Sequence, residues 1–169
     1  MKQVGQFRND SGSKSQHTTS EEKNSPLVAI QAALRDMPLM IRDGDAQKIV
    51  AHCKAIAPLL SQVSTSQIRN VFGPVKRMEL EWTKNASEDK ARAVFRQLVL
   101  LRSKLEYMVA RASKDSKAHM ENFQTLLDKA IEQVEAGSDF QTRRAYFENF
   151  VAFFESLVAF HKRYEKRSS

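Results

Sequence analysis

The chain has few of the residues that make turns and cross-links. Its 169 residues include five glycines, four prolines and one cysteine. β-Sandwich and βαβ proteins need many turns, which glycine and proline supply, so their scarcity disfavours both classes and favours long helices. A single cysteine, Cys53, cannot form an internal disulfide, and this is typical of a protein in a reducing compartment. We therefore expect a cytoplasmic, all-α protein.

Long apolar runs and catalytic signatures are also missing from the sequence. No apolar run approaches the roughly 20 residues of a membrane span, and the first residues lack the apolar stretch of a secretory signal, so we expect no membrane partner. The four histidines are scattered, and no Cys/His spacing matches a zinc site. There is no phosphate-binding loop and no Ser-His-Asp order. These absences predict no catalytic residue, no metal and no cofactor, and hence no enzyme.

Positive charge is present in excess and is unevenly placed. Lys and Arg outnumber Asp and Glu by 27 to 20, which gives a net charge of +7. Residues 65–111 hold ten Lys/Arg against five Asp/Glu, so most of the excess lies in this one stretch. A basic balance indicates an anionic partner, which is a nucleic acid, a membrane surface or an acidic protein.

The apolar residues recur at helical spacing after a polar start. Residues 1–24 predict a disordered tail, because they cannot bury enough apolar surface to offset the entropy of ordering. Residues 25–169 predict a single domain, a compact bundle of five to six helices. Asp45, Thr65, Ser87 and Ser138 are the expected N-caps, and the fifth helix is expected over about 115–136.

Proline and glycine predict three interruptions of these helices. Pro38 is expected to end or kink the first helix, because proline disfavours the α conformation at the residue before it. Gly73-Pro74 is expected either to kink the third helix or to divide it in two. Gly137 is expected to follow the fifth helix as its C′ residue, with a positive φ.

Helical angles place the cations of the third and fourth helices beside the apolar faces. Arg69 and Lys76 share a stripe on the third helix, while Lys104 and Arg111 belong to a seven-residue stripe on the fourth. If the two helices are antiparallel neighbours, these cations form one continuous basic surface that neutralises phosphates. The remaining candidates for RNA contact are Arg77, Lys84, Lys90, Arg92, Arg96 and Gln67.

Each of these residues also has an ordinary structural interpretation. Cations on helices are often simply solvated, with their stems lying on apolar surface. Arg69, Arg92 and Lys104 are expected to lack the favourable local carboxylate partner, which argues against that reading. Gln67 follows a helix start, where glutamine more often caps the helix than binds a ligand.

The aromatic residues gather in the last helix. Phe147, Phe150 and Phe154 share the core stripe, so we assign them to packing rather than to base stacking. A second apolar face indicates either a central position in the bundle or a subunit interface, and we favour the interface. Its members are Phe153, Phe160 and Tyr164.

Three short strings occur in order along the chain. They are TSQIR at 65–69, LEYMVAR at 105–111 and FFESLVAFH at 153–161. With this ordered set the chain resembles the small helical subunit of type III-A CRISPR–Cas effector complexes, the Csm complexes, over about residues 26–165. Phe160 stands where the family more often has tyrosine, and Gly73-Pro74 is a second departure from the family pattern.

The resemblance implies a particular role. Several copies would stack within a ribonucleoprotein for antiviral defence, beside other effector subunits and the guide RNA. The basic face would contact the backbone of target RNA paired to guide RNA, while base pairing reads the sequence. Two other hypotheses stay open, namely a helical adaptor whose basic face binds an acidic protein partner and, least favoured, a metal-dependent nuclease.

Overall fold

The computed structural model describes residues 26–165, and within that range it contains helices and no strand. The elements are α1 (Pro26–Ile41), α2 (Ala46–Ile56), the 3-10 turn η2 (Ala57–Leu60), α3 (Thr65–Glu81), α4 (Glu88–Ala110), α5 (Lys117–Glu135) and α6 (Phe140–Tyr164). The prediction of an all-α bundle of five to six helices is confirmed. The disordered tail predicted for residues 1–24 lies outside the described residues.

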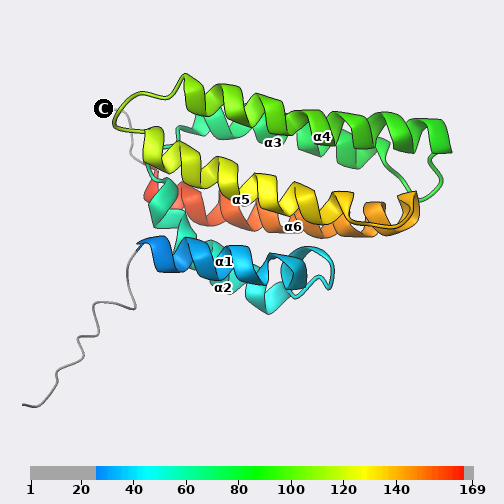
Figure 1. Ribbon diagram of the computed structural model, residues 1–169, viewed down its shortest axis with the longest axis horizontal. Helices are drawn as coiled ribbons and strands as arrows, with labels where there is room; N and C mark the ends of the chain where they lie inside the picture. Colours follow the sequence, from blue (N-terminus) through cyan, green and yellow to red (C-terminus); the bar gives the residue numbers. More distant parts are fainter. Residues whose placement is uncertain (1–25, 166–169) are drawn as a thin grey trace, which may run out of the picture.

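The six helices pack as three layers of two (Figure 1). The α3–α4 pair forms one outer layer, α5 and α6 form the middle layer, and α1 and α2 form the other outer layer. Residues from all six helices join one hydrophobic core. Because the middle layer is covered from both sides, α5 and α6 bury more of their circumference than the outer helices, which keep one face toward solvent.

The prediction of a subunit interface on α6 is wrong for Phe153. Its side chain has 0% exposure, and its carbonyl accepts a hydrogen bond from Cys53 Sγ of α2 at 3.5 Å. The second apolar face of α6 therefore packs inside the bundle, because α6 lies in the middle layer. Phe160 is half-buried against the same core, whereas Tyr164 is exposed, so the interface stays a prediction for Tyr164 alone.

Side-chain caps begin four of the helices. Asp45 and Ser87 cap α2 and α4, as predicted, by accepting from the backbone N–H three residues on. The caps of α3 and α6 are Ser64 and Asp139, each one residue away from the predicted Thr65 and Ser138. Such shifts are expected, since neighbouring polar residues compete to cap the same turn.

Proline ends neither α1 nor α3. Pro38 lies inside α1, and Pro74 lies inside α3, which continues from Thr65 to Glu81 as one helix. Proline inside a helix costs about 3 kcal/mol, so burial must offset that cost. In α1 three residues near the proline are fully buried, and in α3 buried residues lie on both sides of it. They are Met37, Met40 and Ile41 in α1 and Val71, Val75 and Met78 in α3.

The positive φ predicted for Gly137 is also wrong. Within the described residues the glycine with positive φ is Gly44, at 66°, in the turn between α1 and α2. Gly137 meets a different requirement, because the first turn of α6 lies directly against it. A Cβ there would lie 2.7 Å from Arg143 Cγ and 2.9 Å from the Arg143 backbone nitrogen. Glycine is thus required by close approach and not by backbone conformation.

Gly137→Ala should lower the free energy of unfolding by about 1–3 kcal/mol, because the added methyl group overpacks the junction of α5 and α6. Urea denaturation followed by circular dichroism measures this change. The control is Ser138→Ala at the neighbouring exposed position, which should stay within about 0.5 kcal/mol of the parent. An unchanged midpoint for Gly137→Ala would contradict the close approach.

Candidate nucleic-acid interface

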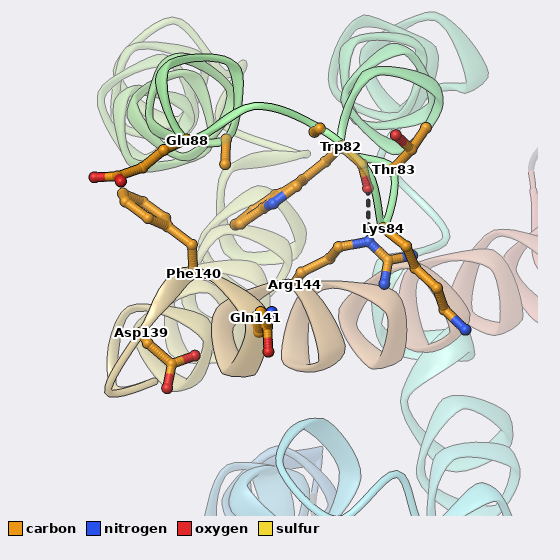
Figure 2. Close-up of a pocket in the computed structure, with 10 residues that line it drawn as sticks. Trp82, Thr83, Lys84, Glu88, Asp139, Phe140, Gln141 and Arg144 are labelled. Carbon is orange, nitrogen blue, oxygen red and sulfur yellow. Dashed lines mark hydrogen bonds between the residues drawn. The ribbon is translucent and has the colours of Figure 1, made fainter.

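α3 and α4 lie side by side and run antiparallel, as the basic-surface prediction required (Figure 1). Lys104 Nζ of α4 reaches across and donates to the backbone carbonyl of Asn70 on α3 at 2.5 Å. This hydrogen bond fixes which residues of α3 lie opposite which residues of α4. Two turns further along α3, Arg77 is level with Gln97 of α4. Lys84 lies beyond the end of α3, in the loop that leads to α4, where it lines a hollow with Gln141 and Arg144 of α6 (Figure 2).

We name this surface the seam face and define it by its exposed cations. Lys90, Lys104 and Arg111 are separated by multiples of seven residues along α4 and its C-cap, which keeps them on one side of that helix, and Arg77 lies across from them on α3. None of them forms an ion pair with a carboxylate in the part of the chain that the structure describes. The members are Arg77, Lys90, Lys104 and Arg111.

Arg69 and Lys76 lie on the opposite flank of α3, next to α6. Lys76 Nζ donates to Glu155 Oε1 of α6 at 2.7 Å and also pairs with Glu79. Arg69 lines a mainly apolar hollow together with residues of α6, including Val158. The prediction that these two cations join Lys104 and Arg111 in one strip is therefore wrong, because α6 packs against the side of α3 that carries them.

Carboxylates engage Lys76 and also Arg92. Glu155 and then Glu79 raise the pKa of Lys76, so this lysine is held protonated but is engaged by carboxylates. Arg92 donates to Glu88 Oε1 at 2.7 Å. The expectation that Arg92 lacks a carboxylate partner is wrong, since Glu88 lies four residues before it on the same face of α4.

Arg102, which was not among the candidates, joins α4 to α5. It donates to Asp128 Oδ1 at 2.6 Å and to Glu135 Oε2 at 2.8 Å, and these carboxylates raise its pKa. The count of ten cations in residues 65–111 therefore overstates the charge available to a ligand. Arg96 differs from Arg92 and Arg102, since it is exposed and forms no ion pair among the described residues.

Gln67 is engaged in capping α3. Its side-chain oxygen accepts from the Ser64 backbone N–H at 2.8 Å, while Ser64 Oγ accepts from the Gln67 N–H at 3.2 Å. This reciprocal pair is a capping box. The structural interpretation of Gln67 is thereby supported, and the cap leaves its oxygen little freedom to bind a ligand.

Exposed apolar side chains accompany the cations of the α3–α4 layer. Leu80 of α3 is 76% exposed, and Leu100 and Tyr107 of α4 are 52% and 59% exposed. Arg111 donates to the Tyr107 hydroxyl at 3.0 Å and lies 5.7 Å from the centre of its ring. Sequence reasoning had not singled out these three residues. The sequence did contain a signal for them, because each is an apolar or aromatic residue among the polar residues on the solvent-facing side of α3 or α4.

The described residues carry no group of three or more His, Cys, Asp and Glu side chains placed to hold a metal ion. None of the helices in residues 26–165 has the length and apolar character needed to cross a bilayer. Fold and surface together define a small all-helical bundle with a cation-rich outer layer.

A family model agrees with this class. The model described as Csm2 Type III-A matches residues 43–167. The chain belongs to this family and is a small subunit of type III-A CRISPR complexes. Comparison with curated proteins and with solved structures gives no match. The match begins after α1 and includes the whole seam face.

Proposed function

We propose that this chain is a non-catalytic, RNA-binding subunit whose seam face contacts the sugar–phosphate backbone of target RNA paired to guide RNA. The observation that carries the proposal is the row of exposed cations across two antiparallel helices, none of them paired with a carboxylate among the described residues. At 1.5 Å per residue, the stripe from Lys90 to Arg111 spans about 30 Å along α4. A row of this length neutralises several phosphates at once.

The seam face suits backbone contact better than base readout. Lysine and arginine bind phosphates whatever the sequence, so they position the protein without selecting a base. A-form duplexes are recognised mainly by shape and by phosphate and ribose contacts. Guide pairing therefore selects the target, and this subunit stabilises the paired strand.

Assembly into a larger complex follows from the family. We infer contacts with other effector subunits, with the guide RNA and with further copies of this chain, in the cytoplasm. The outer α1–α2 layer exposes apolar side chains suited to such protein contacts, including Leu27, Val28, Leu39 and Val50. Many weak contacts would then add up, because assembly raises the effective concentration of each RNA site.

The alternative is an adaptor that binds an acidic protein through the same face. Leu80, Leu100 and Tyr107 favour this reading, since apolar residues among cations are also found at protein interfaces. Both functions use the same surface, so the identity of the anionic ligand separates them.

A salt titration tests the proposed function. The purified full chain should bind a fluorescently labelled RNA duplex with little dependence on sequence. A plot of log affinity against log salt should have a slope on the order of −4, as four released counterions predict. Tighter binding to polyglutamate than to RNA would favour the adaptor, and RNA cleavage after addition of magnesium would contradict the non-catalytic role.

A further inference from the structure

Tyr107 is the most exposed aromatic residue in the part of the chain that the structure describes, at 59%. Trp82, at the end of α3, is only 3% exposed and is packed in the core (Figure 2). Tyr107 lies three residues after Lys104 and four before Arg111, so the three side chains are neighbours on the outward side of α4. The ring is therefore open to a ligand that these two cations of the seam face attract.

Two contacts with Arg111 hold the ring of Tyr107 in position. Arg111 Nη1 donates to the Tyr107 hydroxyl at 3.0 Å, and the guanidinium carbon lies 5.7 Å from the ring centre. Because the ring is already held before a ligand arrives, stacking on it costs less side-chain entropy. The hydroxyl occupies only part of the guanidinium, so the remaining N–H groups of Arg111 can still bind a phosphate.

The charge around the ring is positive. Lys104 gives one N–H to a carbonyl of α3, which leaves its other N–H groups free. The carboxylate next in sequence, Glu106, lies on the α5 side of the helix, where it accepts from Gln124. Neither Lys104 nor Arg111 forms an ion pair among the described residues. An anionic ligand therefore meets an aromatic ring between two available cations within two turns of α4.

Apolar and open surface continues from the ring along the helix. Leu100, 52% exposed, lies seven residues before Tyr107 and so on the same side, about 10 Å along the axis. Gly73 of α3 is one turn from Asn70 in the same direction, and a Cβ there would have no atom within 4 Å. A flat apolar group can therefore lie on the ring and extend toward Leu100.

We propose that Tyr107 is a stacking site for one unpaired base of RNA, with Lys104 and Arg111 binding the neighbouring phosphates. Every nucleobase has a π-face, so stacking adds affinity without selecting a sequence. Tyrosine is a common partner of unpaired RNA bases. The cations serve a paired strand equally well, whereas the ring favours a nucleotide whose base is free. The inference rests on the proposed function.

Two RNA strands with the same number of phosphates isolate the contribution of the bases. One is single-stranded oligoadenylate of 12 nucleotides (A12), and the other is an abasic 12-mer that keeps ribose and phosphate. We expect the full chain to bind A12 about tenfold more tightly than the abasic strand at low salt, the scale of one stacked base. Anisotropy of end-labelled RNA measures both affinities.

Tyr107→Leu removes the ring but keeps an apolar side chain at this exposed position. It should abolish the preference for A12 over the abasic strand and leave binding of the A12·U12 duplex unchanged. Tyr107→Phe keeps the ring and loses only the hydroxyl, so it should retain most of the preference. Tyr164→Leu, at the exposed end of α6, is the matched control and should bind like the parent. Circular dichroism checks that all three variants fold.

The possible outcomes separate this inference from the proposed function. Salt-sensitive duplex binding with equal affinity for A12 and the abasic strand, or with an unchanged preference in Tyr107→Leu, overturns the stacking site and leaves the seam face standing. A loss in Tyr107→Leu of binding to polyglutamate but not to A12 also overturns it and assigns the ring to a protein contact. Failure of every RNA to bind overturns both proposals. A preference for A12 that Tyr107→Leu abolishes and Tyr107→Phe retains supports the stacking site.

Discussion

Phe154→Ala is expected to lower the free energy of unfolding by about 3–5 kcal/mol, the usual cost of truncating a buried phenylalanine. Phe154 is fully buried in the middle layer. Its ring centre lies 5.1 Å from that of Phe72 in α3 and 6.0 Å from that of Phe123 in α5. The substitution therefore removes contacts that join three helices, and the cavity it leaves cannot collapse without moving them.

Chemical denaturation followed by circular dichroism at 222 nm measures this loss. Domains of this kind are stable by only about 5–15 kcal/mol, so the variant should lose a large share of its stability. Tyr164→Ala at the exposed end of α6 is the control and should cost less than about 1 kcal/mol. A loss for Phe154→Ala no larger than that of the control would contradict the burial of this ring among three helices.

The double charge reversal Arg77→Glu and Arg111→Glu should weaken binding to duplex RNA by about a hundredfold at low salt. Each substitution removes one attraction to phosphate and adds one repulsion, each about 1 kcal/mol with water-like screening, and salt reduces the total. The slope of log affinity against log salt should become shallower by about two, because two fewer counterions are released. Anisotropy titrations at several salt concentrations measure both quantities.

The matched control carries the same change in net charge on the opposite layer. Arg42 and Lys54 are exposed near the end of α1 and on α2, far from the seam face (Figure 1). Arg42→Glu with Lys54→Glu should leave the slope unchanged and reduce affinity only slightly, through long-range charge. Equal losses in the two double variants would mean that net charge drives binding and that the seam face has no special part in it.

Periodicity and turn chemistry anticipated most of the fold. Apolar stripes at three- and four-residue spacing located all six helices, because burial of such a stripe is what stabilises a helix in a bundle. The errors came where burial overrides a local preference. Proline disfavours a helix at positions 38 and 74, but buried residues in the same turns hold both helices in place.

The candidate site was anticipated only in part. The seven-residue stripe containing Lys104 and Arg111 could be drawn from α4 alone, and it lies at the seam as expected. Arg69 and Lys76 looked equivalent to it, since both stripes flank an apolar face. Nothing local reveals that α6 packs on one flank of α3 and α4 on the other, and Glu155, the partner of Lys76, is 79 residues away.

The linear order of residues was enough to determine the helices, most of their starts, the basic character of residues 65–111 and the family likeness. These features depend on neighbours within one or two turns, where spacing alone decides which side chains meet. Only the tertiary structure decided that Phe153 is buried and that position 137 has no room for a Cβ atom. It also decided which cations form no ion pair among the described residues. Those outcomes depend on contacts between distant segments, which the layering of the helices creates and no local pattern encodes.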